Sequence, residues 1–487
     1  MVKSLKHKAA AGMIWTALQK YSTMFIGFIS GIILARLLTP YDYGCIGMLS
    51  IFMVLAESFI DGGFGSALIQ KKNPTQEDYS TIFFWNISMA CILYAVLYLC
   101  APTIARFYNI SQLSSVLRVQ GIILFIYAFN IVQRNQLRKN LNFRLLSIVT
   151  IVTSLISLAI TIVMAYHGYG VWALVAQNII TAAIPTIAFW FLVKWRPRLV
   201  FSIKSYRELF GFGFYMFLTH LINQFGQQIQ GLLIGKFYNP TTMGYYSKAS
   251  GTEKLASSSI SQVMTQVTYP LYAEAQNNLS LMQNMIRRLS MSLSYLTFPL
   301  MFILILLARP IFVLLYSDRW LQSVPYFQVL CFAGLAYSLQ SVNYQSISAI
   351  GKSKLMFQWT LVKRIMGLLF VVIGLLGWGM EGLLVGVILN TWFSYFVNIG
   401  LVSKEIGYKW WKQLLDISPM LTISAIAAFL SYLVGNIFKF SLFYDGMIKL
   451  LVFTTIYLTW SFVYKPESFI YIKSFYVDLK KKKNSIT

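Results

Sequence analysis

Runs of about twenty apolar residues recur along the whole chain, and they constrain its fold more than any other feature. A helix needs about 20 such residues to cross the hydrocarbon core of a bilayer. The runs predict an all-α integral membrane protein with 14 transmembrane helices. The predicted spans lie near residues 11–35, 43–67, 81–105, 113–133, 145–166, 170–193, 209–235, 243–267, 290–315, 322–347, 358–377, 381–402, 414–436 and 444–464.

The composition excludes a water-soluble fold. Of the 487 residues, 57% are hydrophobic and 11% are charged, whereas soluble proteins average roughly 25% charged residues. The basic start leads directly into the first span without a small-residue cleavage site, so we expect that helix to be retained. The four cysteines lie in or beside apolar spans and predict neither a disulfide framework nor a metal site.

The placement of Lys and Arg predicts the topology of a chain with a net charge of +25. With a cytoplasmic N-terminus, 29 of the 40 basic residues would face the cytoplasm, 8 would lie opposite, and Lys20, Lys248 and Lys254 would lie within spans. Cytoplasmic loops carry the positive excess, so both termini should be cytoplasmic. Basic residues that bind nucleic acid gather on one soluble face, so we expect contact with membrane lipids and no nucleic-acid partner.

An internal repeat divides the chain. GIILARLLTPYDYG, residues 31–44, matches GLLIGKFYNPTTMG, residues 231–244, without a gap, and GYGVWAL (168–174) matches GWGMEGL (377–383). Such repeats predict two pseudo-symmetric lobes of six helices in the same orientation, followed by two more helices. The expected divisions are an N-lobe over 1–200, a C-lobe over 201–410, helices 13 and 14 over 411–465, and a basic cytoplasmic tail over 466–487.

Charged groups inside spans are candidates for function, because each costs about 2.5–3.5 kcal/mol to insert. Lys20 lies on a polar stripe of the first span, and an offset of 200 residues places a second stripe on the seventh span. The two stripes predict a shared cavity, with hydrogen-bonded helix packing as the alternative. The second stripe comprises Met216, His220, Asn223, Gln227 and Gln230, of which His220, Asn223 and Gln227 are the candidate site residues.

Other charged residues lie on three further spans. Lys254, near the middle of the eighth span, should face water or a ligand, whereas Lys248 is nearer an end and can snorkel. Glu57 and Asp61 share one face of the second span. They could bind a coupling proton or sodium ion, or form an ion pair with Lys20 or Lys254. Arg134 could meet an anionic headgroup or serve only as a topology residue.

The chain lacks the signals of catalysis and of bound cofactors. Three scattered histidines are too few for a metal site, and no triad or nucleotide-binding motif is present. We therefore expect no enzyme activity, no metal and no cofactor.

Two motifs carry a family resemblance. ARLLTPYDYG (35–44) and SALIQKK (66–72), with MGYYSKA (243–249), are similar to the polysaccharide-transport branch of the multidrug/oligosaccharidyl-lipid/polysaccharide exporter superfamily. The resemblance covers residues 10–410 and implies two six-helix lobes arranged as a V. It implies alternating access in a bacterial inner membrane, moving an undecaprenyl-pyrophosphate-linked oligosaccharide to the outer leaflet. It also implies contact with other polysaccharide assembly proteins. Related peptidoglycan-precursor flippases hold pyrophosphate with cations on the first and eighth helices, where Lys20 and Lys254 lie.

The sequence also allows two other functions. A multidrug exporter of the same superfamily would have an aromatic, acidic cavity for organic cations. A membrane glycan polymerase or ligase would need a sizeable outward loop with clustered Arg, His or carboxylates, and none of the expected outward loops has one. For a flippase, Glu57 and Asp61 could neutralise the empty cationic cavity as it resets against the membrane potential.

Overall fold

The computed structural model describes residues 2–438 and 441–471, except the side chains of residues 2–10, 212, 258–260, 262–270, 273, 353 and 438. The predicted tail lies outside the described residues from position 472 onward. The described helices are α1 (Val2–Leu37), α2 (Pro40–Asp61), α3 (Phe64–Gln70), α4 (Gln76–Tyr108), α5 (Gln112–Gln120), α6 (Ile122–Lys139), α7 (Phe143–Tyr166), α8 (Val171–Leu192), α9 (Ile203–Phe237), α10 (Pro240–Glu274), α11 (Leu279–Leu306), α12 (Ala308–Tyr316), η1 (Asp318–Trp320), α13 (Ser323–Ala349), α14 (Ser353–Glu405), α15 (Trp410–Phe438) and α16 (Leu442–Tyr464).

The helices confirm an all-α multi-pass membrane protein. Ten stretches of the described residues are long and apolar enough to cross a bilayer. Each of the 14 predicted spans is almost wholly helical. Two of them fall within α14, where the chain turns at Trp378 and Gly379. The seventh, eighth and tenth predicted spans, which lie in α9, α10 and α13, are not among the ten. In α9, polar side chains such as His220, Asn223 and Gln227 lower the mean hydropathy.

Local signals in the sequence set the ends of α2. Thr39 and Asp42 form a capping box around Pro40, which has the φ angle of a first helical residue. The helix ends at Asp61, and the backbone of the next two residues, Gly62 and Gly63, has φ angles of +53° and +76°. Because glycine adopts positive φ without steric cost, this pair turns the chain sharply from α2 into α3.

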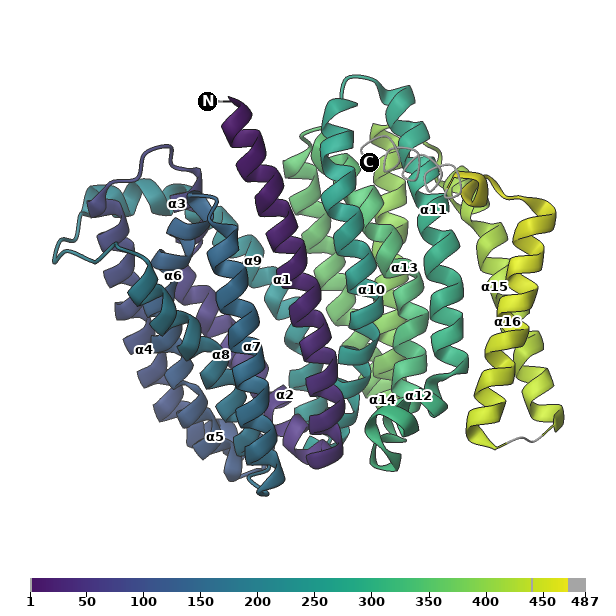
Figure 1. Ribbon diagram of the computed structural model, residues 1–487, viewed down its shortest axis with the longest axis horizontal. Helices are drawn as coiled ribbons and strands as arrows, with labels where there is room; N and C mark the ends of the chain where they lie inside the picture. Colours follow the sequence, from purple (N-terminus) through teal and green to yellow (C-terminus); the bar gives the residue numbers. More distant parts are fainter. Residues whose placement is uncertain (1, 439–440, 472–487) are drawn as a thin grey trace, which may run out of the picture. The chain divides into compact units, whose positions relative to one another are not determined.

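The first of two compact units comprises Met1–Ser247. Within it α1 packs against α7, α7 against α8, α8 against α6, and α6 against α4. Helix α2 contacts α4, α6, α8 and α9, and the long helices run side by side in Figure 1. The internal repeat assigns α9 to the second half, yet α9 packs against α2, α3 and α4. The division into lobes at residue 200 stays a prediction.

The second unit begins at Lys248 and contains the helices from α11 onward. Helix α13 packs against α14 and α11, α11 packs against α15, and α15 packs against α16. The last two predicted spans thus form a helical hairpin that joins this unit through α11.

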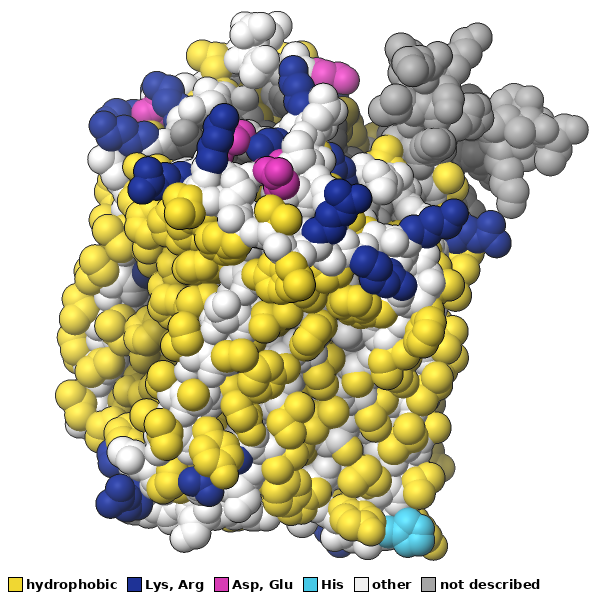
Figure 2. All heavy atoms as spheres, turned by 90° about the vertical axis from the view of Figure 1, so that its left-hand side faces the viewer, with side chains coloured by type: hydrophobic (Ala, Val, Ile, Leu, Met, Phe, Trp, Pro, Cys, Tyr) yellow, Lys and Arg dark blue, Asp and Glu magenta, His cyan; other side chains and the backbone are white. Residues whose placement is uncertain are grey.

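Charged and apolar side chains are separated on the surface. On the face in Figure 2, hydrophobic side chains cover a broad middle band, and most Lys and Arg side chains lie near its two edges. In the first unit, three of the loops expected in the cytoplasm meet. The Lys139 ammonium donates to the carbonyl oxygen of Leu68 at 3.0 Å, and Lys71 forms an ion pair with Glu208 at 3.0 Å. The separation of charged from apolar side chains seen in Figure 2 is the one expected for helices surrounded by lipid.

Candidate functional site

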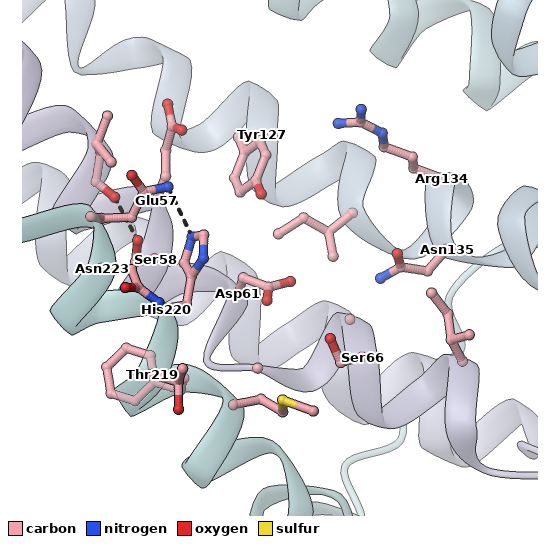
Figure 3. A pocket seen from close by; sticks show the side chains of 18 of the residues that line it. Glu57, Ser58, Asp61, Ser66, Tyr127, Arg134, Asn135, Thr219, His220 and Asn223 are labelled. Atoms are coloured by element: carbon pink, nitrogen blue, oxygen red, sulfur yellow. Dashed lines mark hydrogen bonds between the residues drawn. The ribbon is translucent and has the colours of Figure 1, made fainter. Parts of the chain in front are cut away.

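A cavity of about 470 Å³ lies within the first unit, between α2, α3, α6 and α9 (Figure 3). Its lining combines acidic, basic and amide side chains with few hydrophobic ones. The polar residues that line it are Glu57, Ser58, Asp61, Ser66, Tyr127, Asn130, Arg134, Asn135, Arg138, Thr219, His220, Asn223 and Gln224.

One stripe of α6 supplies the positive charge of this cavity. Tyr127, Asn130, Arg134 and Arg138 are spaced three or four residues apart, so they share one face of the helix. The guanidinium groups of Arg134 and Arg138 are close enough to repel each other. Among the described residues, neither forms an ion pair with a carboxylate. Both side chains are exposed and could bind an anion.

Helix α2 supplies the two carboxylates. The Asp61 carboxylate lies close enough to the backbone N–H groups of Gly63 and Gly65 for them to stabilise its charge, and it attracts His220 and Arg138. A Cβ atom at Gly65 would lie 2.8 Å from Asp61 Oδ1, so a larger residue there would displace this carboxylate. Asp61 is therefore held both by the turn that follows α2 and by the charges around the cavity.

Helix α9 contributes the polar residues of the third wall. His220 Nε2 shares a hydrogen bond of 3.3 Å with Gln224 Nε2, one turn further along the helix. In Figure 3, His220 and Asp61 project into the same space from α9 and α2. Asn223 also lines the cavity, whereas Gln227, one turn further along, does not.

A second cavity of about 610 Å³ lies in the same unit, between α1, α2, α5, α6, α7 and α8. It shares a wall with the first cavity, formed by Val54, Glu57, Tyr127, Asn130, Arg134 and Arg138. The two arginines therefore reach both spaces.

The structure brings together five of the eight predicted site residues: Glu57, Asp61, Arg134, His220 and Asn223. Lys20 lines neither cavity. Its enclosed ammonium nitrogen has no hydrogen-bond partner among the described residues. The predicted ion pair of Lys20 with Glu57 or Asp61 is therefore absent.

The two lysines of the eighth predicted span belong to the second unit, and they differ. Lys254 is exposed. Lys248 is only 8% exposed, and its ammonium lies 4.0 Å from the centre of the Tyr316 ring. The expectation that Lys248 snorkels to the surface is wrong, because a cation–π contact stabilises the buried ammonium instead.

Sequence reasoning missed Arg138, Tyr127 and Asn130. The predicted span ended at residue 133, so Arg138 counted only as a loop charge, whereas α6 continues to Lys139. Asn130, Arg134 and Arg138 follow one another at intervals of four residues. This spacing could have placed Asn130 and Arg138 on the same helix face as the predicted Arg134.

Two known proteins share much of this chain's length. The chain is 26% identical over 358 residues to the teichuronic acid biosynthesis protein TuaB of Bacillus subtilis, covering 73% of this chain and 74% of TuaB. It is 23% identical to the succinoglycan biosynthesis transport protein ExoT of Rhizobium meliloti, covering 84% of this chain and 80% of ExoT.

The fold matches a solved structure, the inward closed conformation of the lipid II flippase MurJ. The TM-score is 0.76 at 16% sequence identity, covering 93% of this chain and 98% of that one. The fold is that of a multi-pass membrane protein, and the relative ExoT is named as a transport protein. Residues 33–325 match the family model described as polysaccharide biosynthesis protein. The chain belongs to this family, as a membrane transporter for polysaccharide biosynthesis.

Proposed function

We propose that this transporter moves an undecaprenyl-pyrophosphate-linked oligosaccharide from the cytoplasmic to the outer leaflet of a bacterial cytoplasmic membrane by alternating access. The observation that carries the proposal is the pair Arg134 and Arg138 on one face of a membrane-spanning helix, at a cavity wall. Like charges four residues apart destabilise a helix, and insertion into the membrane adds a further cost. An anionic substrate would offset both.

The chemistry of the substrate fits this pair. Guanidinium groups bind phosphate oxygens through two parallel hydrogen bonds, so each arginine could hold one phosphate of a pyrophosphate. His220, on the opposite wall, could add a donor. The aqueous cavity would then carry the polar headgroup, while the polyprenyl tail stays in the lipid. Lys20 and Lys254 remain candidates for a further hold on the pyrophosphate.

The expected orientation gives the direction of transport. With both termini cytoplasmic, the C-terminal end of α6, which carries Arg134 and Arg138, lies on the cytoplasmic side, where the lipid-linked sugar is made. An inside-negative potential favours outward movement of an anion by about 2.3 kcal/mol per charge per 100 mV.

Glu57 and Asp61 provide a means of resetting the transporter. An inside-negative potential draws an empty cavity with two unneutralised arginines inward, which reverses the sign expected from the sequence, but the cost of charge in the membrane remains. Asp61, which attracts Arg138 without forming an ion pair with it, and Glu57 at the same cavity could offset part of this charge when no substrate is bound, and a coupling proton or sodium ion could remove their effect. Replacing them together (Glu57→Gln with Asp61→Asn) should abolish any proton or sodium dependence of transport. Unchanged ion dependence would exclude the two carboxylates from coupling.

The proposal can be tested in a strain that lacks the gene. Lipid-linked oligosaccharide should accumulate in the cytoplasmic leaflet, and the wild-type gene should restore outward movement. Arg138→Gln and Arg134→Gln should each reduce that movement at least tenfold, because a lost charge-assisted hydrogen bond is worth about 1.5–3 kcal/mol. Arg144→Gln is the matched control, since the Arg144 side chain lies over the Trp15 ring and lines neither cavity. Normal movement in the deletion strain would favour a multidrug exporter or a polymerase instead.

A further inference from the structure

The second cavity of the first unit differs in chemistry from the first. Apart from the wall that the two share, its polar lining is uncharged and consists of amides and hydroxyls. The amide side chains are Gln19, Gln120 and Asn178, with Asn130 on the shared wall, and the hydroxyl side chains include Thr16, Ser50, Thr150 and Thr181. Such a lining suits a neutral ligand with many hydrogen-bonding groups.

Two of these amides have carbonyl oxygens that accept no hydrogen bond from the described residues. Gln120 is 5% exposed, and its Oε1 atom has no partner. Asn130 donates from Nδ2 to Thr186 Oγ1 at 2.9 Å, but its Oδ1 atom has none. Buried polar atoms are rarely left unsatisfied. Both oxygens are enclosed but belong to side chains that line the second cavity, so a donor such as a hydroxyl in that cavity would reach them after a rotation of the amide side chain.

Apolar rings complete the lining. Phe143 on α7 and Tyr127 on the shared wall are partly exposed, whereas Phe189 on α8 is buried and supports the wall from behind. A sugar ring presents hydroxyl groups at its rim and C–H groups on its faces. The rim matches the unsatisfied amide oxygens, and the faces can pack against aromatic rings.

The position of the cavity links it to the arginine pair. The residues that line it on α5 and α6 extend from Gln120 to Arg138, and 18 residues of helix at 1.5 Å each span about 27 Å. A headgroup held at Arg134 and Arg138 by its pyrophosphate could therefore extend its sugars towards Gln120. A volume of about 610 Å³ lies within the usual range for ligand sites.

We propose that this amide-lined cavity binds the sugars nearest the pyrophosphate, and that Gln120, Asn130 and Asn178 determine which sugars are accepted. The proposal rests on the proposed function, because it takes the substrate to be a lipid-linked oligosaccharide. The ligand class is a neutral, hydroxyl-rich carbohydrate, recognised by amide acceptors and donors rather than by charge.

The test compares two lipids that differ only in the sugar. One is the lipid-linked oligosaccharide that accumulates in the deletion strain, and the other is undecaprenyl pyrophosphate. Binding is measured with the full-length protein in nanodiscs. Gln120→Leu and Asn130→Leu should weaken binding of the sugar-bearing lipid at least tenfold and leave undecaprenyl pyrophosphate unchanged. Gln136→Leu is the matched control, since Gln136 is a half-buried amide on α6 that lines neither cavity. Thermal unfolding checks that each variant is folded.

A second measurement tests the proposal even if the Gln120 or Asn130 variants do not fold. Thr181, an exposed residue of the cavity lining, is replaced by Cys after the exposed Cys91 and Cys100 are changed to Ser. The sugar-bearing lipid should slow its reaction with a thiol reagent, and undecaprenyl pyrophosphate should not.

The outcomes separate the two proposals. Equal weakening of both lipids by Gln120→Leu, no weakening of either, or labelling at Thr181→Cys that the sugar does not slow would each overturn the sugar-binding role. A cavity that holds only water would give the second and third of these results. Failure of the proposed function has a different signature: the wild-type protein would bind neither lipid, or Arg134→Gln and Arg138→Gln would leave the binding of both unchanged.

Discussion

Gly44 lies directly against Pro240, so that a Cβ atom at Gly44 would stand 1.7 Å from the Pro240 carbonyl oxygen. The relationship is reciprocal, because a Cβ atom at Gly244 would stand 1.8 Å from the carbonyl oxygen of Pro40. Gly44 and Gly244 are 200 residues apart and correspond in the internal repeat. The starts of α2 and α10 therefore meet backbone to backbone around a local two-fold relationship.

We predict that Gly44→Ala and Gly244→Ala each destabilise the protein. A methyl group cannot fit at either distance, so the helix starts must separate, and overpacking of this kind costs about 1–3 kcal/mol or more. Thermal unfolding of the detergent-solubilised protein measures the loss. Gly27→Ala is the control, since nothing lies within 4 Å of a Cβ atom at Gly27. If both variants unfold at the wild-type temperature, the starts of α2 and α10 can separate without loss of stability, and the prediction is wrong.

A second pair of repeat-related glycines predicts a backbone effect. Gly170 has φ of +54° and ψ of −128°, and Gly379 has φ of +63° and ψ of −137°. This conformation is available almost only to glycine. Gly170→Ala and Gly379→Ala should each cost about 1–3 kcal/mol of stability. Equal unfolding temperatures for Gly379→Ala and the control Gly251→Ala, where a Cβ atom meets nothing, would contradict this.

Lys71 predicts a pH-dependent contribution to stability. Its ammonium lies 3.0 Å from a carboxylate oxygen of Asp78, which is 1% exposed, and 3.0 Å from one of Glu208. Burial lowers the pKa of Lys71, but hydrogen bonding and attraction from Glu208 and Asp78 outweigh it, so the net pKa is raised. The stabilisation is therefore complete below the ordinary lysine pKa of about 10.4 and declines as the pH rises through the higher folded value.

Lys71→Met should accordingly lower the free energy of unfolding by about 1–3 kcal/mol at pH 7, because it leaves the buried Asp78 carboxylate with one partner fewer. The difference from wild type should narrow above pH 10.4 or so. The more exposed partner gives the comparison: Glu208→Gln should cost less than about 1 kcal/mol. Unfolding temperatures measured from pH 7 to 11 test both predicted losses. A difference between wild type and Lys71→Met that stays constant over this range would refute the role of the Lys71 charge.

The ion pair between Asp445 and Lys449 on α16 predicts strong coupling. The two groups are 2.6 Å apart, 19% and 12% exposed, and lie in an apolar helix. Removing one partner, as in Lys449→Met, leaves a charge in low dielectric and should cost about 3–5 kcal/mol. The double replacement with Asp445→Asn should recover most of the loss. A double-mutant cycle from unfolding measurements decides this, and additive losses would mean that the pair is not coupled.

The candidate site was predictable only in part. Glu57 and Asp61 could be placed together from their spacing of four residues, and Arg134 from its position at the end of a span. Arg138 was not found, because hydropathy ended the span before α6 ends. Lys20 has the spacing of a site residue and yet lines neither cavity, since spacing defines a helix face but not the neighbour that this face contacts.

The sequence by itself determined that the chain is a multi-pass helical membrane protein with an internal repeat, because hydropathy and motif spacing are local properties that need no knowledge of packing. Only the tertiary structure decided which polar side chains share a cavity. Asp61, Arg138 and His220 stand on three helices far apart in sequence, and their meeting depends on how α2, α6 and α9 pack. That packing is the sum of many weak side-chain contacts, which no single segment of the sequence records.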